Sequence, residues 1–374
     1  MLYDKLKTYS TSGVYPMHMP GHKRNTEKLP PGLPYDIDIT EIHGFDDLHD
    51  PTGILEETSQ LAARLYGSNK AYLLVNGTTV GILAAIGALT ARGDKILIAG
   101  EHHWSVTNAA ALFGLTPVFL PPETDETTGV ALSVEPAAVK TALDKEPDVR
   151  LIVVTSPSYE GVVSDISAIA DVAHSRNIPL LTDSAHGAHL GFSPAFPESA
   201  VQAGADIAVM SLHKTLPALT QCSLLHICTD RVDAAEVKRL LSVLQTSSPS
   251  YVLMASISQC LELLSSEKDM LFGDYERNLK DFDATIKTLK NLRVLCHGAD
   301  TLHRGFFAYD PGKLVILAQN TAISGALLAE ILRNDHRIEI ERVCAGYVIA
   351  MTSVCDSPEG FSRLAKALKT IDAL

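Results

Sequence analysis

The chain has no apolar run of the ~20 residues that a membrane-spanning helix needs, and its first residues, MLYDKLKTYS, have no apolar signal core. Its six cysteines form no CxxC pair and fall mostly in apolar runs. In a chain of this length, such cysteines are typical of reduced, buried thiols. We therefore expect a cytoplasmic protein without a membrane segment.

An excess of positive charge is also missing. Lys and Arg together number 31, against 44 Asp and Glu, so the formal net charge is −13. A general nucleic-acid binder needs a basic face, and this composition argues against one. The sequence has neither the GxxxxGK[ST] of nucleotide-hydrolysing P-loops nor the GxGxxG of dinucleotide-binding folds. It also has no internal repeat and no low-complexity segment.

A length of 374 residues suggests about two domains. Residues 1–52 are rich in Pro, Gly, His and Asp, which predicts an extended N-terminal arm. Residues 53–265 alternate short apolar runs with helical segments, which predicts a large α/β domain. Residues 266–374 mix helices with a few strands, which predicts a small α+β domain. In this small domain we expect one long strand over 338–353.

Seven short apolar runs in the large domain predict strands, at residues 71–75, 95–99, 116–120, 150–155, 179–183, 206–210 and 223–227. Continuous apolar strands that alternate with helices form a mostly parallel sheet covered on both faces. Ligands bind to such a sheet at the carboxyl ends of its strands. The residues that follow each strand are therefore the candidates for a site.

Polar groups follow five of these strands. The turn NGTT (76–79) leads into a helix, and it offers N–H groups, hydroxyls and the positive end of the helix dipole to a phosphate. The other four strand ends carry GEHHWS, SPSYEG, SAHGAH and SLHK. Each stretch alone has an ordinary explanation, because Thr and Asn cap many helices and a lysine at a strand end can simply reach water.

At one sheet edge, these groups together predict a site for pyridoxal phosphate (PLP). Lys214 can bond to the aldehyde of PLP, and Asp183 can pair with the pyridine nitrogen and keep it protonated. Asp183 ends a buried strand, where a carboxylate is costly unless it is paired. Burial near cations would lower the pKa of Lys214 and favour its reaction with the aldehyde.

In this order, the motifs NGTT, HHWS, TSPSYEG, DSAHGAH and SLHKTL resemble the large domain of the fold-type I PLP enzymes, the aspartate-aminotransferase-like fold. More narrowly, the chain resembles the bacterial ornithine/lysine/arginine decarboxylase family. The stretches MPGHKRN, DITEIHGFDDLHDPTG and TSSPSY support the narrower resemblance, which extends over nearly the whole chain.

The resemblance implies which residues surround the cofactor ring. Lys214 would be attached to PLP, and Asp183 would pair with the pyridine nitrogen. His103 would stack on one face of the ring and Ala185 would press on the other. His186 would stand near the ring hydroxyl or the substrate.

The resemblance also implies a phosphate-binding set, formed by Gly77, Thr78, Thr79, Ser211 and His213. Ser247 and Ser248 would reach the phosphate from the partner subunit, because members of this fold build their sites at the interface of a homodimer. The arm residues His22 and Lys23 would lie near an active site, across the same interface.

The activity that the resemblance implies is decarboxylation of lysine, arginine or ornithine, which gives CO2 and a diamine or other polyamine precursor. Recognition of a basic side chain needs an acid, and Glu160 and the segment Glu41–Asp50 offer candidates. Family members continue into a further C-terminal domain, so we expect this chain to be a short form.

Three alternatives stay open. Another PLP-dependent reaction, such as transamination or beta-elimination, would use the same fold and cofactor. A metal-dependent hydrolase could use His18 with His22, or His186 with His189, but a Pro-Gly pair separates the first two, and we expect no metal. A non-catalytic protein that kept the fold is the third alternative, and the intact lysine and acid argue against it.

Overall fold

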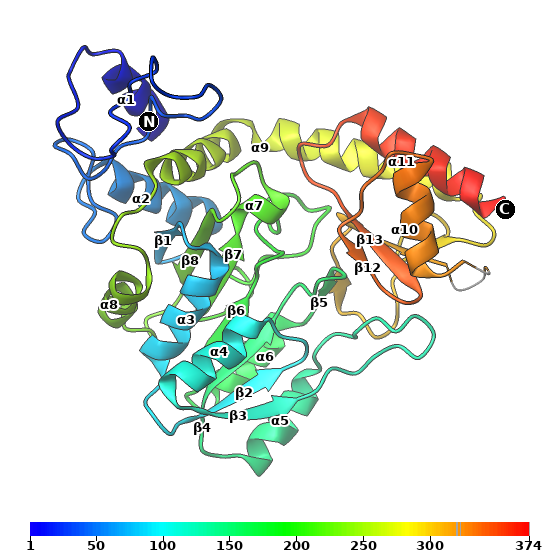
Figure 1. Cartoon of the computed structure of the whole chain (residues 1–374). Coiled ribbons are helices and arrows are strands. Elements are labelled where there is room, and N and C mark those ends of the chain that lie inside the picture. Colours follow the sequence, from blue (N-terminus) through cyan, green and yellow to red (C-terminus); the bar gives the residue numbers. More distant parts are fainter. Residues whose placement is uncertain (319–320, 322, 374) are drawn as a thin grey trace.

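The computed structural model describes residues 1–318, 321 and 323–373. At its centre lies a seven-stranded sheet with the order β1-β8-β7-β6-β4-β2-β3 (Figure 1). Its strands are β1 (Lys70–Leu74), β2 (Lys95–Ala99), β3 (Thr116–Leu120), β4 (Val149–Thr155), β6 (Leu180–Asp183), β7 (Ile207–Ser211) and β8 (Ser223–Ile227). Only β8 runs antiparallel to its neighbours within the described residues. The predicted sheet is confirmed, and each predicted strand lies within one residue of its observed bounds.

Helices cover both faces of this sheet because its strands are apolar on both sides. In β2, Ile96 and Ile98 pack in one core cluster, and Leu97 and Ala99 pack in another. Successive side chains of a strand point to opposite faces, so the two clusters lie on opposite sides of the sheet. The first contains side chains of α3 (Gly77–Leu89), α4 (Trp104–Phe113) and α8 (Ala234–Leu244). The second contains side chains of α2 (Ile54–Tyr66), α5 (Pro136–Lys145) and α6 (Ile166–His174).

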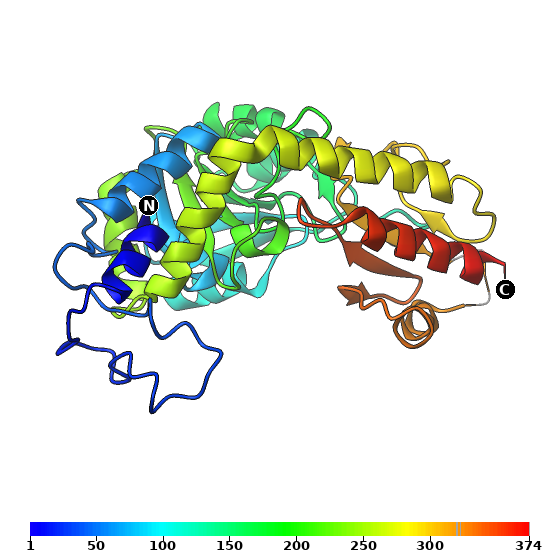
Figure 2. The ribbon, with the colours of Figure 1, turned by 90° about the horizontal axis from the view of Figure 1, so that it is seen from above.

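A single long helix, α9 (Tyr251–Ile286), runs from the large sheet to the C-terminal part of the chain (Figures 1 and 2). Its 36 residues give a length of about 54 Å at ~1.5 Å per residue. The predicted boundary between 265 and 266 falls inside α9, which continues through it without interruption. The division into an arm (1–52), a large domain (53–265) and a small domain (266–374) stays a prediction.

The small domain is built on a four-stranded antiparallel sheet with the order β12-β13-β11-β9. Its strands are β9 (Arg293–Val294), β11 (Lys313–Leu317), β12 (Arg342–Val343) and β13 (Tyr347–Met351). The helices α10 (Gly325–Asn334) and α11 (Pro358–Asp372) pack beside this sheet, and α11 also lies along α9 (Figure 2). Residue 374, which ends the predicted domain, lies outside the described residues.

The prediction of one long strand over 338–353 is wrong, because this run forms a hairpin. β12 and β13 pair antiparallel, and the N–H of Cys344 donates to the carbonyl of Tyr347 at 2.9 Å. Ala345 and Gly346 between them form the turn, which hydrophobic continuity alone conceals. A further two-stranded pairing joins β5 (Val162–Val163) of the large domain to β10 (Ala308–Tyr309) of the small domain.

The N-terminal arm begins with α1 (Leu2–Ser10), whose Leu2 and Leu6 are fully buried, and continues without regular structure to α2. Tyr251, at the start of α9, donates its hydroxyl to the carbonyl of Asp46 at 2.6 Å. The Asp46 carboxylate accepts N–H groups around the first turn of α2, at 2.8 Å from Gly53. The arm is thus fixed to both helices. None of the helices described is long and apolar enough to cross a membrane.

Candidate active site

A cavity of about 550 Å3 lies at the carboxyl ends of the central strands. Ten of the predicted site residues line it, namely Gly77, Thr78, Thr79, His103, Asp183, Ala185, His186, Ser211, His213 and Lys214. β4, β6 and β7 are parallel, so the residues that follow them meet at one edge of the sheet. The structure therefore brings together every residue that was predicted to hold the cofactor from the same subunit, but not the predicted substrate acids.

Lys214 lies in the short helix α7 (Leu212–Thr215), which directly follows β7. Its Nζ is 3.0 Å from Nε2 of His186. Burial lowers the pKa of Lys214, and the negative charge of Asp183 partly opposes this change. The arrangement therefore favours a neutral amine, which is the nucleophilic form of a lysine side chain.

Asp183 is the last residue of β6, and its side chain is only 3% exposed. Burial raises the pKa of this carboxyl, while the N–H of Ala185, 3.1 Å from Oδ1, and the positive charges of Lys214 and His103 oppose the rise. A buried carboxylate that borders a cavity is stabilised by a cationic ligand group.

The turn before α3 leaves the N-terminus of that helix open to the cavity. Gly77 has a φ of +74°, a conformation that glycine adopts without strain. Asn76 turns its side-chain oxygen to the N–H of Thr246, at 3.1 Å, and not to the helix. The N–H of Gly77 donates to the carbonyl of Gln221 at 3.1 Å. The other N–H groups of the first turn have no partner inside the helix, so they can bind an anion here. The hydroxyls of Thr78 and Ser211 bond to each other beside this turn.

Two further side chains are held in fixed orientations at the cavity. His103 precedes α4, and its Nδ1 accepts the N–H of Ser105 at 3.2 Å. Nδ1 of His213 lies 3.0 Å from the carbonyl oxygen of Cys222, for which the ring donates its N–H. Fixed rings of this kind suit a site that must hold a flat ligand in one position.

Several further charged or aromatic residues line the cavity and were not predicted as site residues, namely Glu101, His102, Trp104, Tyr159 and Arg342. The guanidinium of Arg342 lies 4.8 Å from the ring centre of Tyr159. Burial, together with the charge of Glu160, raises the pKa of Glu101. Glu101 and Tyr159 lie in the quoted strand-end stretches GEHHWS and SPSYEG, so the signal was present. Arg342 comes from the hairpin that was predicted as a single strand.

The proposed substrate acid Glu160 lies behind this wall of the cavity. Its side chain is 2% exposed, and Oε1 accepts the hydroxyl of Tyr347 at 3.0 Å. The same oxygen is 3.5 Å from the guanidinium of Arg342. Glu160 therefore balances the charge of Arg342 and does not border the cavity.

A buried lysine that the sequence did not single out also approaches this site. Lys313, at the start of β11, is 1% exposed, and its Nζ lies 2.8 Å from Nδ1 of His186. Burial lowers the pKa of Lys313 to about 8, and Asp310 is the strongest opposing charge. The sequence signal was a lysine at the first position of the apolar run KLVIL.

The residues expected across a subunit interface lie outside the cavity of their own chain. Ser247 and Ser248 are exposed in the loop between α8 and α9. In the arm, His22 bonds to Asp38 at 3.2 Å, and Lys23 bonds to the carbonyl of a nearby histidine. Their predicted approach to a partner's active site stays a prediction.

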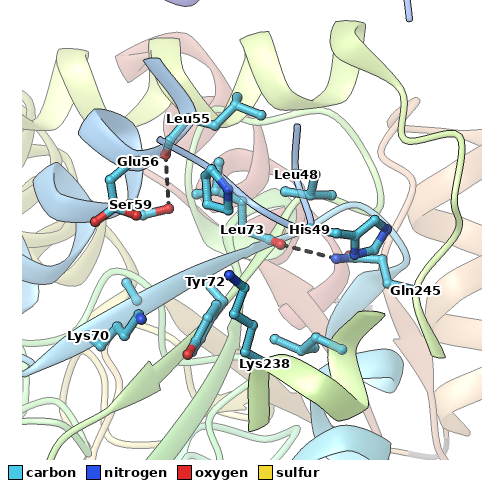
Figure 3. A pocket seen from close by; sticks show the side chains of 13 residues that line it. Leu48, His49, Leu55, Glu56, Ser59, Lys70, Tyr72, Leu73, Lys238 and Gln245 are labelled. Carbon is cyan, nitrogen blue, oxygen red and sulfur yellow. Dashed lines mark hydrogen bonds between the residues drawn. The ribbon is translucent and has the colours of Figure 1, made fainter. Parts of the chain in front are cut away.

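A second, smaller hollow lies between the arm, α2, β1 and α8 (Figure 3). Its volume of about 80 Å3 is room for two or three water molecules at ~30 Å3 each. Its polar groups bond to the protein, because Lys238 pairs with Asp50 at 2.7 Å and His49 bonds to the carbonyl of Thr246 at 2.8 Å. The segment Glu41–Asp50, predicted to offer a substrate acid, thus borders this hollow and not the large cavity.

The histidine pairs with metal-ligand spacing bond to protein groups. His18 lies 2.9 Å from the hydroxyl of Tyr9, and His22 pairs with an aspartate as described above. His189 lies 3.0 Å from the buried carboxylate of Asp310. Within the described part of the chain, no cluster of three or more His, Cys, Asp or Glu side chains is placed to hold a metal ion.

Comparison with known families identifies the chain. The family described as "Orn/Lys/Arg decarboxylase, major domain" matches residues 1–295. The chain belongs to this family. It is 34% identical over 378 residues to an arginine decarboxylase of Bacillus subtilis, with 99% of this chain and 76% of the relative covered. It is 25% identical over 289 residues to the lysine decarboxylase LdcA of Pseudomonas aeruginosa, with 68% and 38% covered.

Solved structures show the same fold. The Francisella novicida lysine decarboxylase LdcF has a TM-score of 0.87 and 19% identity, and it covers all of this chain. This chain spans only 60% of that protein. An alanine–glyoxylate aminotransferase from Nostoc has a TM-score of 0.67 and 15% identity, with 87% of this chain and 88% of that one covered. These neighbours are fold-type I PLP enzymes, so the predicted fold class is confirmed.

The family and the fold imply PLP as the cofactor, and the cavity fits it. The buried carboxylate of Asp183 is matched by a protonated pyridine nitrogen, and the amine of Lys214 is matched by an aldehyde. The open N-terminus of α3 and the hydroxyls of Thr78 and Ser211 offer donors to a phosphate. These three requirements occur together in a single cavity.

Proposed function

We propose that the protein is a PLP-dependent decarboxylase that acts on a basic amino acid. The observation that carries the proposal is the position of Lys214. Its amine lies in a cavity beside the buried Asp183 and 3.0 Å from His186, in a member of the Orn/Lys/Arg decarboxylase family. The chain spans about three fifths of the length of the lysine decarboxylase structures it resembles, so its activity and substrate remain proposals.

In this proposal each side chain acts at a stated place. PLP, when bound, supplies the electron sink that stabilises the electron pair left by CO2. Asp183 keeps a proton on the pyridine nitrogen, and His103 lies against the ring. The N-terminus of α3, with Thr78, holds the phosphate. Once CO2 has left, the α-carbon takes up a proton, which Lys214 in its protonated form or a nearby histidine would donate.

We propose Glu101 as the acid that binds the basic end of the substrate. It lines the cavity, whereas Glu160 does not. The relatives with 31–34% identity are named arginine decarboxylases, and those named lysine decarboxylases have 25–26% identity. Arginine is therefore the first substrate to test, followed by lysine and ornithine. The product would be an amine that serves as a polyamine precursor.

The proposal includes a homodimer in the cytoplasm. Ser247 and Ser248 are exposed on the loop before α9, where they are free to reach a partner subunit. Sedimentation analysis of the full chain tests the assembly, and a monomer at micromolar concentration would contradict it.

The decisive experiment is an absorbance spectrum of the purified full chain with added PLP, before and after borohydride. Attachment to Lys214 is expected to give a visible band that reduction abolishes while it fixes the cofactor to the protein. Lys214→Ala should lose the band, and the control Lys95→Ala should keep it, because Lys95 lies on β2 and pairs with Glu146. A band that survives Lys214→Ala would contradict the assignment.

The reaction itself is identified by its products. Release of CO2 from arginine, lysine or ornithine is expected in stoichiometric amounts with the amine product. A keto acid with no CO2 would identify an aminotransferase, and loss of a side-chain group would identify a lyase of another kind. Either result would replace the proposed reaction while it leaves the cofactor assignment in place.

A further inference from the structure

His186 has a lysine amine at each of its two ring nitrogens. Nε2 lies 3.0 Å from Nζ of Lys214, and Nδ1 lies 2.8 Å from Nζ of Lys313. The two lysines come from different parts of the chain, since Lys214 follows β7 and Lys313 begins β11 of the small domain. His186 and Lys313 are buried, and Lys214 is partly buried.

The chemistry of these groups restricts their protonation. A neutral imidazole has one N–H and one lone pair, while an ammonium group can only donate. Whichever nitrogen of His186 carries the hydrogen needs a neutral amine as its acceptor. Both contacts are therefore hydrogen bonds only if at least one of the two lysines is unprotonated. The three side chains share protons as a unit.

We propose that Lys313 is a positioning residue that keeps the amine of Lys214 unprotonated through His186. In this arrangement the Lys313 ammonium donates to Nδ1, and the N–H at Nε2 donates to the lone pair of Lys214. The inference rests on the proposed function, because it concerns the lysine that would bind PLP. It adds to that function a residue from the small domain.

The same geometry lets a proton reach Lys214 without solvent. The N–H bond at Nε2 breaks as an N–H bond forms at Nζ of Lys214. An N–H bond of the Lys313 ammonium breaks as one forms at Nδ1. His186 is neutral before and after, with its hydrogen on the other nitrogen, and the single positive charge has moved from Lys313 to Lys214.

The surroundings of the three groups support this assignment. Burial is the largest cause that lowers the pKa of His186, and the charges of Lys313 and Lys214 lower it further, so the imidazole is neutral at pH 7. Asp310, which is fully buried, and the charges of Glu341 and Glu160 act in favour of a charged Lys313, whereas burial and the charge of Lys214 act against it.

Other titratable side chains also surround His186 and the two lysines. His189 lies 3.0 Å from Asp310 and is a further positive neighbour of His186 when protonated. The Tyr159 ring centre lies 4.5 Å from the ring of His186 and 6.0 Å from Nζ of Lys313, and its hydroxyl bonds to Glu341. For Lys214, burial lowers the pKa and the charge of Asp183 raises it. The charge of His213, which lies on α7, lowers the pKa of His186.

The path of the Lys313 side chain depends on a glycine. A Cβ at Gly161 would lie 2.6 Å from Cγ of Lys313, which is closer than two carbon atoms can approach. The φ of Gly161 is +97°, which other residues rarely adopt. Gly161 directly precedes β5, and the carbonyl of Gly161 accepts the N–H of Asp310 at 2.8 Å. The backbone here leaves room for a lysine to reach His186.

The test is the rate at which the cofactor-stripped full chain captures PLP, measured by growth of the visible band from pH 6 to pH 10. Capture needs the neutral amine of Lys214. In Lys313→Met the positive charge beside His186 is gone, so Lys214 becomes protonated more readily, and its ammonium then donates to Nε2. We expect capture at pH 7 to slow roughly tenfold for each pKa unit that Lys214 gains, and to recover above pH 9. Lys95→Met should leave the profile unchanged.

A merely structural role of Lys313 would slow capture equally at every pH, and such a parallel profile would overturn the inference. Lys313→Gln keeps a donor to Nδ1 without a charge, so its profile should lie between those of the wild type and Lys313→Met. If Lys313→Met does not fold, the glutamine variant decides by the same criterion. Failure of the wild type to capture PLP at all would instead refute the proposed function.

Discussion

Replacement of Lys313 by methionine is expected to change the free energy of unfolding in a pH-dependent way. Burial lowers the pKa of Lys313 from 10.5 to about 8, so the folded chain holds this proton less tightly than the unfolded chain. Between these two values the unfolded state binds more protons, and stability rises with pH. The cost of burying the ammonium is complete below pH 8 and is lost above pH 10.5.

The size of this cost follows from the two pKa values. A fall from 10.5 to about 8 corresponds to about 3 kcal/mol, at ~1.4 kcal/mol for each pH unit. Methionine has nearly the same length as lysine and carries no charge, so it removes this cost. It also leaves Nδ1 of His186 without a hydrogen-bond partner, which costs ~1–3 kcal/mol. We therefore expect the variant to be as stable as the wild type or more stable at pH 7. At pH 10.5 the variant should be less stable than the wild type. The difference in free energy of unfolding between variant and wild type should thus change by about 3 kcal/mol from pH 7 to pH 10.5.

The assay is urea denaturation of the cofactor-free full chain, followed by far-ultraviolet circular dichroism at several pH values between 7 and 10.5. Cofactor-free protein is required because bound PLP would itself stabilise the folded state. Lys95→Met is the matched control, since Lys95 is a strand lysine outside the cavity and pairs with Glu146. A stability difference between Lys313→Met and the wild type that is the same at pH 7 and pH 10.5 would refute the reasoning.

Three further predictions test single contacts of the site. Gly161→Ala should lower the free energy of unfolding by ~2–4 kcal/mol in the same urea assay, through its positive φ and the contact with Lys313, and an unchanged midpoint would contradict the described packing. Asp183→Asn should weaken PLP binding at least roughly tenfold in equilibrium dialysis, because an amide cannot hold the proton at the pyridine nitrogen, and equal retention would remove Asp183 from that role. Glu101→Gln should raise KM for the basic substrate roughly tenfold with little change in kcat, and a loss confined to kcat would assign Glu101 to the chemical step instead.

Much of the site could be predicted because it follows from local rules. A strand that is apolar on both faces belongs to a parallel sheet, and the residues after such strands meet at one edge. This is why Gly77, Asp183 and Lys214, which lie far apart in the sequence, could be placed in one cavity. The roles of these residues are still predictions, whereas their proximity is a feature of the structure.

Two of the residues that escaped prediction, Lys313 and Arg342, come from the small domain. Lys313 and His186 are 127 positions apart, and no local pattern indicates which face of the small domain packs against the cavity. Arg342 was hidden by the missed hairpin turn. Glu160 was chosen as a substrate acid because it follows a strand, but the hydroxyl of Tyr347 and the charge of Arg342 hold it behind the cavity wall.

The pairing of β5 with β10 has a mechanical consequence. Two segments that are about 145 residues apart share a backbone ladder at the same edge where Gly161 accepts the N–H of Asp310 and Lys313 reaches His186. This ladder ties the backbone just before β11 to the loop that follows β4, so it fixes where Lys313 starts relative to the large sheet. The reach of the Lys313 amine to His186 is therefore set by backbone pairing as well as by side-chain packing.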